Sequence, residues 1–128
     1  MRSDVLVIED RDYLRQILVA VLREYGYQAV GLGSAAEALE RLEDIKPRLI
    51  VLDMKMPGMD GREFLIRLRA KPTWTDLPVL IVSAFGETVL AGREHGTLAV
   101  LEKPFDNATL VARVKQMIGP AGAVSAPA

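Results

Sequence analysis

The amino-acid sequence predicts a doubly wound α/β fold, in which helices cover both faces of one parallel sheet. Short apolar runs alternate with segments of helical periodicity along the 128 residues. The runs are continuously apolar and rich in β-branched residues, as in strands that are buried on both faces. Half of the residues are hydrophobic, which is enough for one core in a chain of this length. We therefore expect one domain, with ligands at the carboxyl ends of the strands.

The first predicted strand and helix are followed by a short second strand. Residues 5–8, VLVI, form the first strand. Apolar side chains between residues 14 and 25 then recur at helical spacing, and Gly26 is a natural helix stop. Residues 28–31 form the second strand.

A capping box marks the second helix, because Ser34 stands three residues before Glu37. We expect this helix to continue to about residue 42. The third strand is the run LIVL at residues 49–52, and it ends abruptly at Asp53.

The third helix follows a loop of turn-forming residues, MPGMDG, at positions 56–61. Phe64 and Leu68 lie on the apolar side of this helix. The fourth strand, residues 79–82, begins after a proline and stops at Ser83.

The last third of the chain predicts two more helices and one strand. A short helix spans about residues 87–94, and residues 98–101 form the fifth strand. Asp106 or Asn107 caps the last helix, which a Gly–Pro pair ends. Residues 119–128 are expected to form a disordered tail.

Composition excludes several classes of function. The 16 basic and 17 acidic residues give a net charge of −1, which argues against bulk electrostatic binding of nucleic acid or membrane. The absence of cysteine excludes disulfides, thiol catalysis and zinc–thiolate sites, and one histidine cannot make a His-rich metal site. No apolar run is long enough for a signal peptide or a membrane span, so we expect a cytoplasmic protein.

Charged and polar residues follow four of the predicted strands. Three carboxylates, a hydroxyl and an ammonium would meet at one edge of the sheet: those of Glu9, Asp10, Asp53, Ser83 and Lys103. Adjacent carboxylates repel one another and therefore need a cation. Oxygen ligands without cysteine or a usable histidine favour Mg²⁺ over Ca²⁺, because few protein ligands are on offer.

Each of these residues also has an ordinary structural explanation when it is taken alone. Asp53 is a common type of turn residue, and Glu9 and Asp10 could cap the first helix. Lys103 could be a solvated lysine in a turn. Their occurrence at four separate strand ends makes chance placement improbable.

Four segments together resemble the receiver domain of two-component response regulators. The resemblance covers about residues 5–118 and implies a receiver domain over residues 1–118. It also implies the flavodoxin-like (CheY-like) fold, with a five-stranded parallel sheet of order 2-1-3-4-5 and five helices. The segments are VLVIED at 5–10, IVLDMKMPGMDG at 50–61, VLIVSA at 79–84 and LEKPF at 101–105.

The resemblance implies the phosphoryl chemistry. Asp53 would accept a phosphoryl group from a histidine kinase or a histidine phosphotransfer protein. Ser83 and Lys103 would each contact a phosphoryl oxygen, and the Lys103–Pro104 bond would be cis. Transfer of this kind depends mainly on positioning and on neutralisation of negative charge.

The resemblance also implies a Mg²⁺ site. Asp10 and Asp53 would bind the ion directly and Glu9 through water, with the main-chain carbonyl of Lys55 as a further ligand. The domain would phosphorylate and dephosphorylate only itself, and so would not be an enzyme for external substrates. Its downstream partner would be a protein, with no direct contact to nucleic acid or membrane.

Two other classes share parts of this pattern. A flavodoxin-like FMN-binding module would need a Ser-, Thr- and Gly-rich phosphate loop where Glu9 and Asp10 stand. A Mg²⁺-dependent phosphohydrolase of the haloacid dehalogenase type would need a second aspartate two residues after Asp53, where Lys55 stands. Both alternatives are therefore weaker than the receiver domain.

Overall fold

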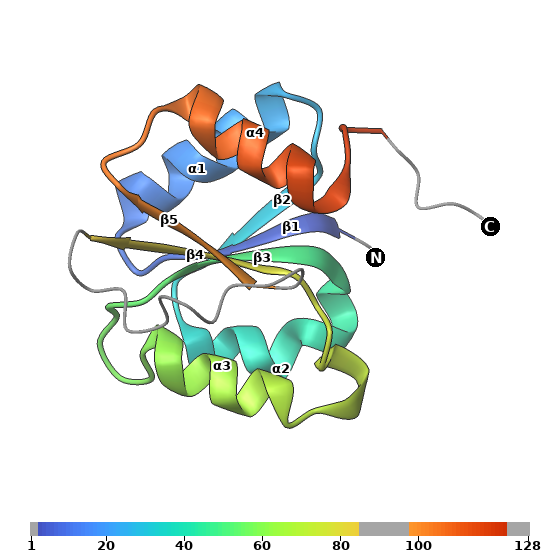
Figure 1. Ribbon diagram of the computed structural model, residues 1–128. Coiled ribbons are helices and arrows are strands. Elements are labelled where there is room, and N and C mark those ends of the chain that lie inside the picture. Colours follow the sequence, from blue (N-terminus) through green and yellow to red (C-terminus); the bar gives the residue numbers. More distant parts are fainter. Residues whose placement is uncertain (1–2, 85–97, 123–128) are drawn as a thin grey trace.

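The protein forms a five-stranded parallel sheet between two layers of helices. The computed structural model describes residues 3–84 and 98–122. The strands lie in the order β2-β1-β3-β4-β5, and all four neighbouring pairs are parallel (Figure 1). This is the predicted order, so the carboxyl ends of all five strands lie at the same edge of the sheet.

Strands and helices alternate through the first half of the described chain and again at its end. The strands are β1 (Ser3–Ile8), β2 (Ala29–Leu32), β3 (Pro47–Asp53), β4 (Val79–Ala84) and β5 (Leu98–Lys103). The helices are α1 (Asp12–Glu24), α2 (Ala35–Ile45), α3 (Gly61–Arg69), the 3₁₀ turn η1 (Pro72–Trp74) and α4 (Asn107–Ile118).

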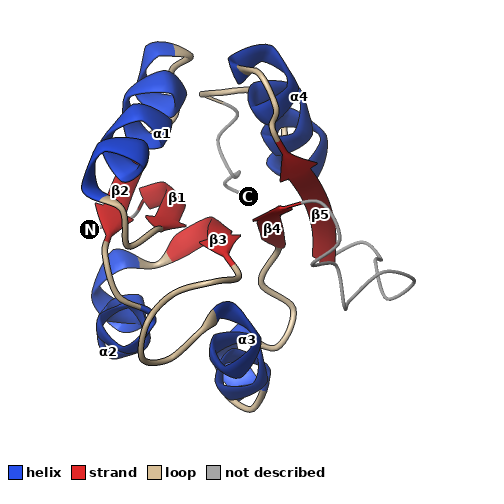
Figure 2. Cartoon of the chain, turned by 90° about the vertical axis from the view of Figure 1, so that its left-hand side faces the viewer, coloured by secondary structure: helices blue, strands red, loops and turns tan. Residues whose placement is uncertain are grey.

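An apolar core lies on each face of the sheet, where side chains of the strands pack against those of the helices. Side chains of successive strand residues point to opposite faces, so Val5 and Val7 of β1 pack toward α1 and α4, whereas Leu6 and Ile8 pack toward α2 and α3. Figures 1 and 2 show this division, with α1 and α4 on one face and α2 and α3 on the other. The continuous apolar runs in the sequence follow directly from this double burial.

Most predicted elements are confirmed, with shifts at their ends. The strand predicted to stop before Ser83 continues to Ala84, and the fifth strand reaches Lys103 rather than stopping at residue 101, because Ser83 pairs with Glu102 and Ala84 with Lys103. Backbone pairing does not need apolar side chains, so hydrophobicity underestimated both strands. Ser83 and Lys103 are thus strand residues and not loop residues, Ser83 the last but one of β4 and Lys103 the last of β5.

Helix ends agree with the capping signals. Ser34 accepts a hydrogen bond from the Glu37 N–H, as the capping box predicts, although α2 extends to Ile45 rather than residue 42. Its C-cap, Lys46, takes the left-handed conformation (φ 48°). Asp106, not Asn107, caps α4 by accepting from the Thr109 N–H.

Some predictions concern segments that the structure describes only in part. The helix expected over residues 87–94 lies outside the described residues, as do positions 123–128 of the expected tail. Positions 119–122 are described, and Ala121 packs against the core beneath α1 and α4. Within the described ranges, each helix is too short or too polar to span a bilayer.

A network of polar side chains lies at the edge of the sheet where the strands begin. This edge is here called the amino edge. The Asp4 carboxylate accepts from the Gln28 N–H at 2.8 Å and from Arg48 at 3.3 Å. Arg48 also donates to the Ile118 carbonyl at 2.8 Å, and the Tyr27 hydroxyl donates to the Gly119 carbonyl at 2.8 Å. These bonds attach the end of α4 to the sheet.

The connection between α3 and β4 folds around one arginine. Nη1 of Arg69 donates to the carbonyls of Trp74, Thr75 and Leu77 at 3.2, 3.0 and 2.8 Å. The indole of Trp74 is buried, and its N–H donates to Glu43 of α2 at 2.9 Å. Tryptophan 74 therefore has the packing role that its apolar side chain favours.

Candidate functional site

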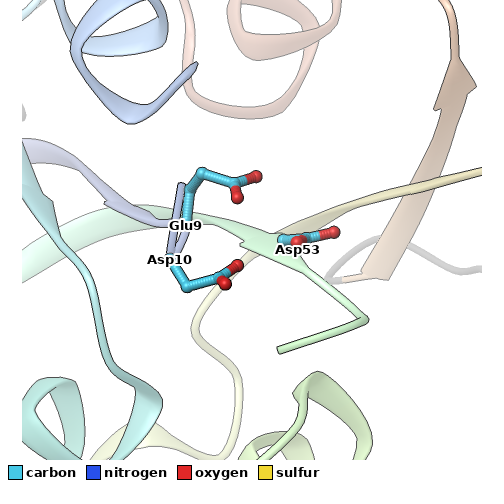
Figure 3. A group of neighbouring side chains, drawn as sticks. All are labelled: Glu9, Asp10 and Asp53. Atoms are coloured by element: carbon cyan, nitrogen blue, oxygen red, sulfur yellow. The ribbon is translucent and has the colours of Figure 1, made fainter. Parts of the chain in front are cut away.

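Three carboxylates meet where β1 and β3 end. Glu9 and Asp10 directly follow β1, and Asp53 is the last residue of β3. One carboxylate oxygen of each residue lies within 4.8 Å of the other two. In Figure 3 the side chains of Glu9 and Asp10 leave the end of β1 and turn toward the same side as Asp53. The parallel register of the two strands produces this meeting.

Burial makes this cluster costly unless a cation compensates it. Glu9 is 1% exposed and Asp53 is 5% exposed. Burial raises the pKa of Glu9 above its usual value, the negative charge of Asp53 raises it further, and hydrogen bonds from Arg11 act in the opposite direction. Hard carboxylate oxygens that are gathered and partly desolvated fit a small divalent cation such as Mg²⁺.

Lys103, the last residue of β5, brings a positive charge to Asp53. Its Nζ lies 3.4 Å from Oδ1 of Asp53, and its side chain is 24% exposed. The peptide bond between Lys103 and Pro104 is cis, as the resemblance implied. Lys103 therefore lies at the edge where the sequence predicted it, and its ion pair with Asp53 is a finding of the structure.

Ser83 is a buried polar group at the same edge. It is 0% exposed, and its Oγ has no hydrogen-bond partner among residues 3–84 and 98–122. In the sheet Val82 pairs with Asp53, so Ser83 lies one position further toward the carboxyl edge. No hydrogen bond joins Ser83 to Asp53 in the described part of the protein. A buried hydroxyl without a partner is costly, so its retention here indicates a use.

The loop after β3 folds back on Asp53. Met54 and Met56 are buried, whereas Lys55 between them is exposed. The Gly61 N–H donates to the Met54 carbonyl at 3.0 Å. A Cβ at Gly61 would lie 2.8 Å from the Asp53 carbonyl oxygen, so only glycine fits this close approach. The assignment of the Lys55 carbonyl as a metal ligand stays a prediction.

Sequence reasoning missed Arg11 as a partner in this site. Its backbone N–H and its Nε both donate to Oε2 of Glu9, at 3.0 and 3.3 Å. The hydrogen bond from Nε to Glu9 raises the pKa of the Arg11 guanidinium. The sequence held one signal for it, because a basic residue at the start of a helix is unfavourable to the helix dipole unless an acidic group is near.

Sequence reasoning also missed Arg15, which binds the backbone of the site at Glu9. Its Nη1 donates to the Glu9 carbonyl at 2.9 Å, and its Nη2 donates to Asp12 at 2.6 Å. The side chain crosses Gly31 and Gly33, where an added Cβ would lie 2.9 Å from atoms of Arg15. These two glycines therefore leave the space in which Arg15 reaches the end of β1.

This fold and this site define a class of signalling domain: a five-stranded parallel sheet with an acidic cluster and a lysine at its carboxyl edge. The family model for the response regulator receiver domain matches residues 5–115. The chain therefore belongs to the receiver domains of response regulators, which are phosphoacceptor modules of two-component signalling. This assignment favours neither a flavodoxin nor a phosphohydrolase of the haloacid dehalogenase type.

Similarity to characterised relatives agrees with the family. The DNA-binding response regulator MtrA of Mycolicibacterium smegmatis is 34% identical over 117 residues, which are 90% of this chain and 50% of MtrA. The phosphate regulon transcriptional regulatory protein PhoB of Escherichia coli is 33% identical over 120 residues, 92% of this chain and 52% of PhoB. The chain thus spans about half the length of these relatives.

A solved structure shows the same fold over nearly the whole chain. It is the signal receiver domain of a signal transduction histidine kinase from Syntrophus aciditrophicus. The two chains are 26% identical, with a TM-score of 0.81, and the match covers 98% of this chain and 97% of the other. Receiver domains of this family act with a histidine kinase.

Proposed function

We propose that Asp53 is the phosphoacceptor of this receiver domain. The observation that carries the proposal is the position of its buried carboxylate, which has a lysine at 3.4 Å and two further carboxylates within 4.8 Å. The phosphoryl donor is a phosphohistidine of a histidine kinase or of a histidine phosphotransfer protein.

The proposed transfer exchanges one bond to phosphorus for another. A carboxylate oxygen of Asp53 forms the new O–P bond, the P–N bond of the phosphohistidine breaks, and its electron pair stays on the imidazole nitrogen. The product is an aspartyl phosphate with a charge of roughly −2 at neutral pH, in place of the single negative charge of the free carboxylate. Lys103 already lies beside Asp53 and would contact one phosphoryl oxygen. The unpartnered Ser83 hydroxyl would donate to another.

The acidic cluster is proposed to hold Mg²⁺. Asp10 and Asp53 would bind the ion directly, Glu9 through water, and Lys55 through its main-chain carbonyl. The bound ion supplies positive charge that offsets the charge of the phosphoryl group. The chain's own contribution is to gather these oxygens before the donor arrives, which Arg15 assists by fixing the Glu9 backbone.

We also propose how the signal leaves the domain. Residues 1–118 form the receiver unit and 119–128 a tail, and phosphorylation changes the contact with a protein target. That target is a separate protein or a further part of a longer polypeptide, since MtrA and PhoB are about twice as long as this chain. Phosphorylation and dephosphorylation of Asp53 itself are the only reactions expected of the domain, which would act in the cytoplasm without direct contact to nucleic acid or membrane.

Intact mass spectrometry tests the phosphoacceptor assignment. Incubation with acetyl phosphate and Mg²⁺ should add one phosphoryl group to the wild-type protein and none to Asp53→Asn. The matched control is Asp76→Asn, because Asp76 is an exposed aspartate after η1. This control should be phosphorylated like the wild type.

Two results would overturn the proposal. One is an equal phosphoryl addition to the Asp53→Asn protein. The other is no addition to the wild-type protein under conditions that phosphorylate a second receiver domain in the same reaction. Omission of Mg²⁺ should abolish the reaction if the acidic cluster holds the ion.

A further inference from the structure

Arg11 is placed to act on the acidic cluster from outside the set of residues already assigned. It lies at the N-cap position of α1, and its side chain is 50% exposed. Both of its bonds to Glu9, from the backbone N–H and from Nε, end on the same oxygen, Oε2. The guanidinium therefore neutralises a carboxylate that is itself almost fully buried.

The three carboxylates of the cluster differ in how they are paired. Glu9 has Arg11 and Asp53 has Lys103, each through one ion pair. Asp10 has no ion pair within the described residues. Two positive charges on the protein thus already compensate part of the repulsion among three negative charges. A divalent cation that enters the cluster must compete with them.

We propose that Arg11 is a resident counter-cation, which neutralises Glu9 in the metal-free protein and thereby weakens the binding of a divalent cation. The inference rests on the metal site of the proposed function and goes beyond it, because it assigns control of metal affinity to a residue outside the ligand set. Arg11 is a positioning residue and not a catalytic one. It keeps the cluster stable without metal at the expense of metal affinity.

The physical reason is a competition between charges. A guanidinium close to Glu9 repels a divalent ion in the same cluster, and the partly desolvated surroundings strengthen this repulsion. Removal of the guanidinium leaves the buried carboxylate dependent on the metal. Metal affinity should therefore rise as metal-free stability falls.

The variant Arg11→Gln isolates the charge. The Arg11 side chain makes no capping hydrogen bond to α1, so glutamine removes no cap. The backbone N–H of position 11 remains and can still donate to Glu9. The half-exposed position accommodates either side chain, so the variant should fold. Arg11→Lys keeps the positive charge and tests whether charge alone accounts for the effect.

A matched control comes from the exposed pair on α2. Arg41 lies 3.6 Å from Glu37, so Arg41→Gln breaks an arginine–glutamate pair by the same substitution. This pair lies on α2, whereas the acidic cluster lies at the ends of β1 and β3. The control separates a local effect on the cluster from the general loss of one positive charge.

The experiment measures Mg²⁺ affinity by isothermal titration calorimetry and the melting temperature with and without Mg²⁺. Arg11→Gln should bind Mg²⁺ about three- to tenfold more tightly than wild type, the size expected for one half-exposed charge that water and salt screen strongly. Its melting temperature without metal should be lower, and its rise on Mg²⁺ addition larger. Arg11→Lys and Arg41→Gln should keep the wild-type affinity.

The outcomes separate this inference from the proposed function. If wild type binds Mg²⁺ and Arg11→Gln binds it equally or more weakly, the counter-cation role is wrong and the metal site stands. A purely structural role for Arg11 would lower the melting temperature with and without metal and would not tighten binding. If neither wild type nor Arg11→Gln binds Mg²⁺, both the metal site and the inference fail.

Discussion

Both edges of the sheet carry charged groups, but the two edges satisfy them differently. At the amino edge, Asp4 accepts from both Arg48 and the Gln28 backbone, and Arg48 and Tyr27 donate to carbonyls at the end of α4. At the carboxyl edge, three carboxylates share two ion pairs, and a buried hydroxyl has no partner in the described chain.

This difference separates groups that hold the fold together from groups that are kept for chemistry. A satisfied network of hydrogen bonds and ion pairs stabilises the folded state. An excess of buried negative charge and an unsatisfied hydroxyl reduce stability, and folded proteins retain such features mainly at functional sites. The carboxyl edge should therefore respond to ligands, and the amino edge should respond to substitutions.

The largest expected effect is the stabilisation of the carboxyl edge by Mg²⁺. A ligand that binds only the folded state stabilises it by about 2.7 kcal/mol at one hundred times its dissociation constant. The melting temperature should rise with Mg²⁺ concentration at constant ionic strength, as measured by differential scanning calorimetry.

Asp10→Asn is the matched test of this effect, because Asp10 has no ion pair to lose among residues 3–84 and 98–122. The variant should lose most of the Mg²⁺-dependent rise. It should melt at or above the wild-type temperature without metal, because one repelling charge is gone. A wild-type melting temperature that Mg²⁺ leaves unchanged would contradict the acidic site.

The next effect concerns the amino edge. Arg48→Ala should lower the free energy of unfolding by about 2 kcal/mol, the usual loss when a partly buried charged hydrogen-bond donor is removed. Urea unfolding measures it. The same substitution at exposed Arg41 should cost less than about 0.5 kcal/mol. Equal losses at both positions would mean that the amino-edge network contributes no special stability.

Two serine substitutions should have smaller effects, and these should change the free energy of unfolding in different directions. Ser34→Ala should lower the free energy of unfolding by about 1 kcal/mol, because it removes the N-cap of α2. Ser83→Ala should leave this free energy unchanged or raise it by about 1 kcal/mol, because it removes a buried hydroxyl without a partner.

Chemical denaturation of both serine variants without Mg²⁺ gives this comparison. A loss at position 83 as large as that at position 34 would show that the Ser83 hydroxyl is satisfied and contributes to the fold. The same Ser83→Ala protein should take up a phosphoryl group more slowly than wild type, which keeps its chemical role separate from its structural one.

The smallest effect is a pH dependence outside both edges. Hydrogen bonds from Thr109 hold the pKa of the exposed Asp106 carboxyl below its usual value. A lowered pKa in the folded state contributes stability above the usual carboxyl pKa, and this contribution disappears as pH falls through the lowered pKa. The difference in unfolding free energy between wild type and Asp106→Asn should be constant at neutral pH and shrink below about pH 4.

Much of the fold followed from patterns that the sequence shows directly. The apolar runs are continuous because each strand is buried on both faces, as Val5 to Ile8 illustrate. Parallel strands end at one edge, so the meeting of Glu9, Asp10 and Asp53 followed from topology alone. The position of Lys103 at the same edge followed in the same way, whereas its ion pair with Asp53 is seen only in the structure.

Other features depend on geometry that hydrophobic patterns do not carry. The last two residues of β4 and β5 extend no apolar run, because they are Ser83 and Ala84 in β4 and Glu102 and Lys103 in β5, and their backbone pairing is independent of side-chain type. The bond between Arg11 and Glu9 depends on how the chain turns between β1 and α1, and two residues of separation leave that turn undetermined. The space over Gly31 and Gly33 that Arg15 occupies forms only when β2 packs beside α1, so the sequence alone does not show it.

Arg69, which donates to three carbonyls after α3, affects where a protease can cleave this protein. Surface connections between secondary structures are the usual places of first cleavage, because a protease needs an extended, accessible stretch of backbone. Here the backbone of residues 74–77 cannot extend without losing three bonds to Arg69 together and drawing Trp74 out of the core. A cut at this connection would therefore report the loss of the Arg69 bonds and of the Trp74 packing, and not the motion of a free loop.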